Sequence, residues 1–252
     1  MSYLYADPAE PPTPRVLALG DAAASVAFGA RIAPEVRQKV QAFCAALAAA
    51  PIEGVEEWAP AFASVAVWFD PDRISFDALA PRLLALARAP ASLALPGALF
   101  EIPFCAEGAF APDLAEVARL NGLTPAAYLE RLGRLTLEVY MLGFQPGFAY
   151  LGALPDSLSA PRLATPRTRV PAGSVAIADG MCAAYPYGSP GGWRLIGRTP
   201  APLFDVSNER RPALLAPGDR VRWRSIARNE YDAHAARWRA GGFDPAELRA
   251  PR

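Results

Sequence analysis

This 252-residue sequence has little of several residue types, and each scarcity excludes a class of site. Lysine occurs once, at Lys39, so a Schiff-base lysine or a phosphate-binding GxxxxGK[ST] loop would have to use it, and its context VRQKVQAF fits neither. Histidine also occurs once, at His234. The three cysteines, Cys44, Cys105 and Cys182, are far apart, so we predict neither a zinc site nor a disulfide framework.

The sequence also lacks a net charge and a long hydrophobic run. Its 25 basic residues balance 25 acidic ones, so no electrostatic field favours nucleic acid or an anionic membrane. The nearest approach to a membrane span, residues 83–99, is broken by Arg88, Pro90 and Pro96. The N-terminal residues lack the charged and apolar regions of a signal peptide. These features predict a folded cytoplasmic protein that binds no nucleic acid, membrane or metal.

The first 92 residues show strand and helix patterns in the order ββαββα. A helix over Pro34–Ala49 starts at a proline and repeats apolar residues every three or four positions, and a second, over Ser75–Arg88, starts at a serine that can cap it. The expected strands cover residues 16–19, 25–28, 55–58 and 64–69. This order predicts an α+β domain over residues 15–92, a ferredoxin-like sandwich with helices on one face of an antiparallel sheet.

Turn motifs rich in proline and glycine dominate the chain after a junction at residues 88–97. We expect strands at residues 99–104 and 135–144, the latter with Leu137, Val139 and Met141 on one face, and short helices at residues 112–120 and 125–132. Pro and Gly take the two central positions of type II turns predicted at residues 189–192 and 216–219. Short strands between such turns predict a mainly-β barrel over residues 97–227, followed by a helical tail over residues 228–252.

Two arginines, Arg162 and Arg167, each follow a proline in the string PRLATPR. Because proline fixes φ, they are expected on a rigid, extended loop. A guanidinium held in that way can bind a carboxylate or a phosphate through two parallel hydrogen bonds, which makes both arginines catalytic candidates. Spacing alone favours the alternative, that they form structural ion pairs or contacts with a partner protein.

Ser174 is the third catalytic candidate, between a turn and a strand in VPAGSVAIA. Its hydroxyl could donate to a substrate carbonyl or an oxyanion. A nucleophilic serine would need a base, and the only histidine lies in the C-terminal tail. The alternative is a turn hydroxyl that bonds to the local backbone.

The string YPYGSPGGWRLIGRT combines aromatic rings with glycines that let a backbone approach a ligand closely. The alternative is a tight hairpin with its rings packed in the barrel core. The residues predicted to bind substrate or to form an interface with another protein of a complex are Gly147, Gly173, Tyr185, Ser189, Trp193, Arg198 and Thr199.

Five strings occur in order: GFQPGFAYLGALP, PRLATPR, VPAGSVAIA, YPYGSPGGWRLIGRTP and APGDRVRW. Together they resemble the family of the B subunit of ATP-dependent 5-oxoprolinase, which includes the kinase inhibitor KipI and the allophanate hydrolase subunit 1 domain of urea carboxylases. The resemblance implies a cyclophilin-like barrel in a protein that acts with A-type and C-type subunits to hydrolyse 5-oxo-L-proline to L-glutamate. ATP, with Mg²⁺, would be a co-substrate of the complex, held by no single chain, and the isolated chain is expected to be inactive. Leu132 and Ala149 depart from the usual histidine and proline.

The resemblance leaves three alternative functions open. The first is a KipI-like inhibitor of a histidine kinase. The second is one half of the carboxyltransferase of a urea carboxylase-type enzyme, with biotin on another chain because no biotin-accepting AMKM string is present. The third, proline isomerase, rests on likeness to the cyclophilin fold alone, and fold does not carry function.

Overall fold

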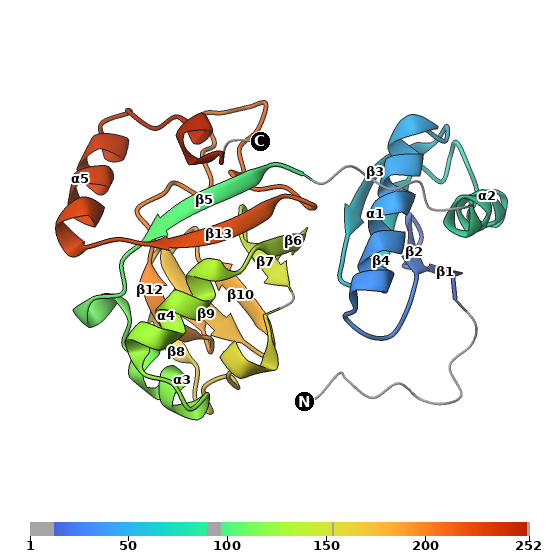
Figure 1. Cartoon of the computed structure of the whole chain (residues 1–252). Coiled ribbons are helices and arrows are strands. Elements are labelled where there is room, and N and C mark those ends of the chain that lie inside the picture. The colour runs from blue at the N-terminus through green and yellow to red at the C-terminus, as the bar shows by residue number, and fades with distance from the viewer. Residues whose placement is uncertain (1–12, 90–96, 153, 251–252) are drawn as a thin grey trace. The chain divides into compact units, whose positions relative to one another are not determined.

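The computed structural model describes residues 13–89, 97–152 and 154–250. Contacts divide the chain into two compact units, residues 1–95 and 96–252, and each is considered by itself (Figure 1). No helix within the described residues has the length and hydrophobicity needed to cross a membrane.

The first unit is a four-stranded antiparallel sheet with two helices, and its strand order is β1-β2-β4-β3. The elements are β1 (Arg15–Ala18), β2 (Ala23–Ala27), α1 (Pro34–Ala49), β3 (Val55–Pro60), β4 (Ser64–Phe69) and α2 (Phe76–Arg88). The hydroxyl of Ser75 caps α2 by accepting a hydrogen bond from the backbone N–H of Ala78. Phe43 of α1 and Leu83 of α2 are buried with Val67 of β4 in one core, because the apolar stripe of each helix faces the sheet.

The second unit is built on a seven-stranded sheet of order β12-β9-β10-β7-β6-β13-β5. Its strands are β5 (Leu99–Phe104), β6 (Leu137–Leu142), β7 (Ala149–Gly152), β9 (Ser174–Ala178), β10 (Met181–Ala184), β12 (Arg194–Arg198) and β13 (Arg220–Ser225). The two edges meet where Cys105, directly after β5, and Arg198 exchange two backbone hydrogen bonds of 2.8 Å. The sheet therefore closes almost completely into a barrel, and the prediction of a mainly-β second half is confirmed.

Helices and a small second sheet surround this barrel. They are η1 (Gly108–Phe110), α3 (Leu114–Leu120), α4 (Pro125–Arg134), η2 (Asp156–Leu158), α5 (Arg228–Arg239), η3 (Pro245–Leu248) and the antiparallel pair β8 (Arg167–Val170) and β11 (Ser189–Gly191). Figure 1 shows α4 beside β13, and α5 beyond the end of β13. Trp238 and Leu248 belong to the buried cluster that fills the barrel, so the C-terminal residues pack onto this unit.

Two local predictions in the second unit are wrong. Met141 does not continue the buried face of Leu137 and Val139, because the register of β6 against β7 shifts between Val139 and Met141. Residues 189–191 form strand β11 in place of a turn, since Ser189 pairs with Val170 of β8. Local turn chemistry was overridden there by pairing with a strand that is distant in sequence.

Candidate functional site

Four of the residues singled out in the sequence come together on the outer face of the barrel sheet. Side chains alternate along a strand, and Leu151 of β7 and Ala184 of β10 are in the barrel core. Tyr150 and Tyr185, each adjacent in sequence to one of these core residues, therefore lie on the opposite face. We define the arginine–tyrosine cluster as Tyr150, Arg162, Arg167, Tyr185 and Trp193.

Packed aromatic rings form the buried side of this cluster. The ring centroids of Tyr150 and Trp193 are 5.9 Å apart, and both rings meet the buried ring of Phe148 edge to face. Phe148 also meets Tyr185, at 5.2 Å. Tyr185 and Trp193 are buried, but neither belongs to the barrel core, so these rings form a separate layer outside it.

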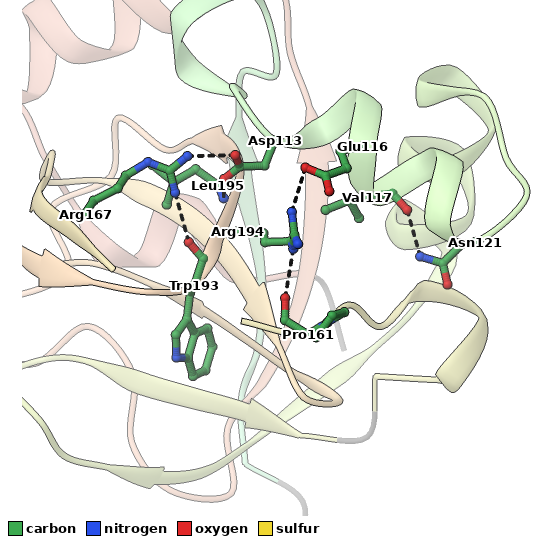
Figure 2. Close-up of polar contacts among 9 residues, drawn as sticks. All are labelled: Asp113, Glu116, Val117, Asn121, Pro161, Arg167, Trp193, Arg194 and Leu195. Carbon is green, nitrogen blue, oxygen red and sulfur yellow. Dashed lines mark hydrogen bonds and ion pairs between the residues drawn. The ribbon is translucent and has the colours of Figure 1, made fainter. Parts of the chain in front are cut away.

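Arg167, on β8, is held by a buried carboxylate. Its Nη2 group donates to Asp113 over 2.7 Å, and its Nη1 group donates to the carbonyl oxygen of Trp193 over 3.4 Å (Figure 2). Asp113 is only 7% exposed and also accepts a 2.6 Å hydrogen bond from the backbone N–H of Leu195. Its carboxylate therefore joins β8, β12 and the start of α3 at one point, which fixes the direction of the guanidinium.

A second buried arginine ties α3 to the loop that carries Arg162. Arg194 is 8% exposed; its Nε donates to the carbonyl oxygen of Pro161, and its Nη1 lies 2.8 Å from a carboxylate oxygen of Glu116 (Figure 2). Asn121, at the end of α3, donates to the carbonyl oxygen of Ser159 over 3.0 Å. Hydrogen bonds from Arg194 and Asn121 thus hold residues 159–161, so the backbone directly before Arg162 is fixed.

Arg162 itself reaches toward solvent. Its Nε donates to Asp179 over 2.8 Å, with side chains 59% and 50% exposed, and its guanidinium lies 5.7 Å from the centre of the Trp193 ring. An ion pair this exposed contributes little to stability. A guanidinium has five N–H donors, and this contact engages one of them. Arg162 is therefore the most accessible cation of the cluster.

Both tyrosines hold their phenolic protons more tightly than a tyrosine in solvent. Burial raises the pKa of Tyr185 to about 12, although the nearby charges of Arg162 and Arg167 act in the opposite direction. Burial also raises the pKa of Tyr150, again opposed by Arg162. At neutral pH each hydroxyl is a hydrogen-bond donor beside positive charge. This combination suits a ligand with anionic or carbonyl oxygens.

Positive φ at non-glycine residues occurs next to the cluster. Among the described residues, Phe144 (φ 69°) and Asp179 (φ 50°) are the two non-glycine residues with positive φ. The Phe144 ring meets that of Tyr185 at 6.4 Å, and Asp179 binds Arg162. Asp179 precedes Gly180 (φ 78°) in the two-residue turn between β9 and β10, where positive φ is usual. Phe144, a bulky residue at positive φ, is therefore the strained position beside the cluster.

The two glycines predicted at the site have positive φ and close neighbours. Gly173 (φ 78°) leaves no room for a β-carbon, which would overlap the carbonyl oxygen of Thr199. Gly147 (φ 78°) is equally confined, since a β-carbon there would lie 2.7 Å from that of Phe204. Both glycines serve close backbone packing.

The remaining predicted residues contact other groups, although Ser189 lies on the strand that pairs with the strand of Arg167. Ser174 is buried at the start of β9, and its carbonyl oxygen accepts from the backbone N–H of Tyr185. Thr199 is buried, and its hydroxyl accepts from the N–H of Ala201. The guanidinium of Arg198 lies 4.4 Å from the centre of the Phe110 ring. Ser189, on β11, has a buried hydroxyl with no hydrogen-bond partner among the described residues.

The only histidine offers no base to Ser174. His234 lies on α5, where its ring stacks on Trp238 with centroids 4.7 Å apart and its Nε2 is 3.6 Å from Glu230. The described residues contain no group of three or more His, Cys, Asp or Glu side chains that could hold a metal ion. The site therefore offers binding and positioning groups more plainly than a nucleophile.

The two departures from the resembling family lie in the barrel core. Leu132 of α4 is fully buried in the main core cluster, and Ala149 is buried in the same cluster at the start of β7. Both residues contribute to packing here.

Sequence reasoning missed the acidic partner of Arg167. Asp113 precedes α3 at its N-cap position, which is a common place for aspartate, but its side chain bonds to Leu195 and Arg167 in place of the helix. Those partners are 82 and 54 residues away, and no local pattern indicates them.

Comparison with known proteins identifies relatives. Residues 14–215 match the family described as carboxyltransferase domain, subdomain C and D. A protein of Bacillus subtilis (strain 168), named as the B subunit of 5-oxoprolinase, is 38% identical over 227 residues, which cover 86% of this chain and 94% of that protein. A Haemophilus influenzae protein with the same name is 47% identical over 127 residues, which cover 50% of this chain and 59% of that protein.

A solved structure agrees with this relationship. The crystal structure of TTHA0988 is similar with a TM-score of 0.71 and 36% identity over 81% of this chain. The present chain spans only 40% of the length of that one.

Proposed function

This chain belongs to the carboxyltransferase domain family, subdomains C and D, and we propose that it is the B subunit of an ATP-dependent 5-oxoprolinase. In this proposal it acts with A-type and C-type subunits to hydrolyse 5-oxo-L-proline to L-glutamate, and the isolated chain has no activity. The observation that carries the proposal is the match to the Bacillus subtilis protein of that name, which extends over 94% of its length.

The chemistry of the substrate fits the arginine–tyrosine cluster. 5-Oxoproline carries a carboxylate and a lactam carbonyl, and ATP carries phosphates. An amide is a poor electrophile, so coupling to ATP makes sense if its oxygen is phosphorylated before water attacks. Arg162 and Arg167 would bind and orient anionic oxygens, and the neutral hydroxyl of Tyr150 would donate to one of them. Tyr185 and Trp193 are buried and would form the floor beneath.

The cluster is one side of a site. Its accessible members are cations and hydroxyl donors, which hold and position a substrate but do not activate water. The base and the groups that bind ATP with Mg²⁺ would therefore come from the other proteins of the complex. This arrangement would explain why the isolated chain has no activity.

We also propose finer assignments for the two units. The first, over residues 15–92, would be a ferredoxin-like sandwich with permuted connections: its strand order β1-β2-β4-β3 is the order of that fold if the last strand is moved to the front. The second, over residues 97–227 with the tail 228–252, would be a cyclophilin-like barrel. A cytoplasmic location would suit an ATP-dependent complex and the three free cysteines.

The carboxyltransferase alternative has support from the description of the matching family and from fold. The crystal structure of the Kluyveromyces lactis urea amidolyase matches 96% of this chain with a TM-score of 0.77, but at 19% identity. Fold likeness at that level does not transfer a reaction.

A reconstitution experiment tests the proposed function. The purified chain is mixed with the A-type and C-type subunits, 5-oxo-L-proline, ATP and Mg²⁺, and glutamate and phosphate are measured. We expect both products only when all three proteins are present. A complete complex that binds 5-oxoproline but never releases glutamate would contradict the substrate, and glutamate release without this chain would contradict its role.

A further inference from the structure

A second group of arginines surrounds a buried tyrosine at the end of strand β12. We define the second arginine cluster as Phe110, Arg198, Arg228, Tyr231 and Arg239. Its members come from η1, from the last position of β12 and from α5. The arginine–tyrosine cluster contains Trp193, directly before β12, so the two clusters lie at opposite ends of this strand.

Two guanidinium groups of the second arginine cluster lie over one aromatic ring. Their central carbons are 4.4 Å (Arg198) and 4.3 Å (Arg228) from the centre of the Phe110 ring. The Phe110 ring is buried, and the centre of the Tyr231 ring is 4.6 Å away. A guanidinium that lies over a ring makes this contact through its face, and its N–H groups lie in its plane. The packing therefore brings two cations together and leaves most of their donors available to an acceptor.

The cations of this cluster outnumber the carboxylates that neutralise them. Arg228 donates through Nε to Asp232 over 3.1 Å, and its backbone N–H donates to Glu107. Arg198 and Arg239, in contrast, form no ion pair with any described residue. The Nε group of Arg198 is also buried without a hydrogen-bond partner in the described part of the chain. A buried donor without an acceptor is unfavourable, so an anion at this point would satisfy both the donor and the charge.

The hydroxyl of Tyr231 provides a further donor at the same point. Tyr231 is only 8% exposed, and its hydroxyl forms no hydrogen bond with the described residues. Burial raises the pKa of Tyr231, and the positive charges of Arg198, Arg239 and Arg228 act in the opposite direction. The three charges therefore lie near this one hydroxyl. A tyrosine keeps its proton at neutral pH, so the hydroxyl can donate to an anionic oxygen.

We propose that the second arginine cluster binds a phosphate group, either free phosphate or the terminal group of a nucleotide. The tetrahedral oxygens of a phosphate dianion can accept from Arg198, Arg239 and the Tyr231 hydroxyl together. A carboxylate carries one charge on two oxygens and would balance less of the excess. This site goes beyond the proposed function, and it does not rest on the proposed reaction because it needs this chain alone.

Binding of inorganic phosphate to the full chain, measured by calorimetry at constant ionic strength, tests the site. A parallel titration uses ATP without Mg²⁺. Arg198→Gln and Arg239→Gln should each weaken phosphate binding about tenfold or more, because each removes a charged donor. Tyr231→Phe keeps the ring and should weaken binding about threefold. Arg134→Gln is the matched control, because Arg134 is an exposed arginine paired with Glu130 on α4, and it should bind phosphate like the wild type.

The source of the phosphate group follows from the two titrations. ATP that binds more tightly than inorganic phosphate, with both losses in Arg198→Gln, identifies a nucleotide as the ligand. Equal affinities identify free phosphate. Circular dichroism verifies that each variant is folded, and Arg239→Gln, on the exposed end of α5, changes no buried group.

Three results would overturn the site. The first is wild-type affinity in both arginine variants, or no binding of phosphate by the wild-type chain. The second is a loss of phosphate binding in Arg162→Gln but not in Arg198→Gln, which would place the anion in the arginine–tyrosine cluster. The third is acetate that binds as tightly as phosphate, which would contradict the class of ligand. If phosphate binds as expected but the complete complex never hydrolyses 5-oxoproline, the site stands and the proposed substrate fails.

Discussion

Asp113 and Arg167 form an ion pair of 2.7 Å between the start of α3 and strand β8, and the same carboxylate accepts the backbone N–H of Leu195 on β12. Asp113 is almost fully buried, whereas Arg167 is partly open to solvent. One end of the pair is therefore structural, and the other end is presented at the candidate site. The orientation of a partly accessible cation therefore depends on a buried carboxylate.

This arrangement predicts a marked stability loss for Asp113→Ala, about 2–3 kcal/mol, because Leu195 N–H and Arg167 lose their acceptor in a buried setting. Asp113→Asn keeps an acceptor and should cost less. Glu130→Ala, which removes an exposed pair with Arg134, should stay within about 0.5 kcal/mol. Urea unfolding measures all three, and equal losses for Asp113→Ala and Glu130→Ala would contradict the anchoring role.

The raised pKa of Tyr185 predicts that the free energy of unfolding decreases at high pH. Its pKa is raised to about 12 in the folded state, against about 10 when unfolded, so the folded protein holds the phenolic proton more tightly. The resulting stabilisation is complete below pH 10 and is lost as the pH rises through 12. Tyr185→Phe should show a smaller decrease in unfolding free energy over that range. An identical pH profile in the variant would show that Tyr185 does not cause the decline.

Arg162→Gln provides an independent check on the cluster. The positive charge of Arg162 favours the phenolate forms of Tyr185 and Tyr150, so its removal should raise the pKa of both tyrosines further. Ultraviolet absorbance of the phenolate, followed during an alkaline titration, measures the shift. Unchanged pKa values would place Arg162 away from the tyrosines.

Gly173 and Gly122 form a matched pair for testing close packing. Both have positive φ, but a β-carbon at Gly173 overlaps Thr199, whereas one at Gly122 meets open space. Gly122→Ala should cost about 1 kcal/mol through backbone strain alone, and Gly173→Ala about 2 kcal/mol more. Thermal unfolding compares them. Equal losses would mean that the backbone at Gly173 shifts freely.

Leu132→His tests whether the missing histidine matters. Leu132 is fully buried, so an imidazole there would have to stay neutral, and we expect a loss of about 2–4 kcal/mol. The loss should grow as the pH falls below about 6.5, because the unfolded chain then binds the proton more readily. Unchanged stability together with a gain in glutamate release would instead assign this position to catalysis.

The sequence predicted well those features that depend on near neighbours. Helix α1 has its expected bounds, Ser75 caps α2 as expected, and the turn at residues 216–219 has Gly218 at positive φ. The conformation of residues 189–192 could not be predicted from the local sequence, because it depends on pairing with β8.

Site prediction was limited for the same reason. The Pro/Gly strings indicated Arg162, Arg167, Tyr185 and Trp193, which the barrel brings together. The carboxylates that hold the arginines, Asp113 and Asp179, come from distant segments. Ser174 and Thr199 are buried in backbone packing that no spacing rule reveals.

The most direct test of the account is the kcat/KM for 5-oxo-L-proline in the reconstituted three-protein complex, compared between the wild type and Arg162→Gln. Arg134→Gln, which removes an exposed arginine paired with Glu130 on α4, is the control. We predict a decrease of about tenfold or more for Arg162→Gln, with unchanged affinity for the C-type subunit, and no change for Arg134→Gln. Wild-type kcat/KM in Arg162→Gln would contradict a role for the arginine–tyrosine cluster in the reaction.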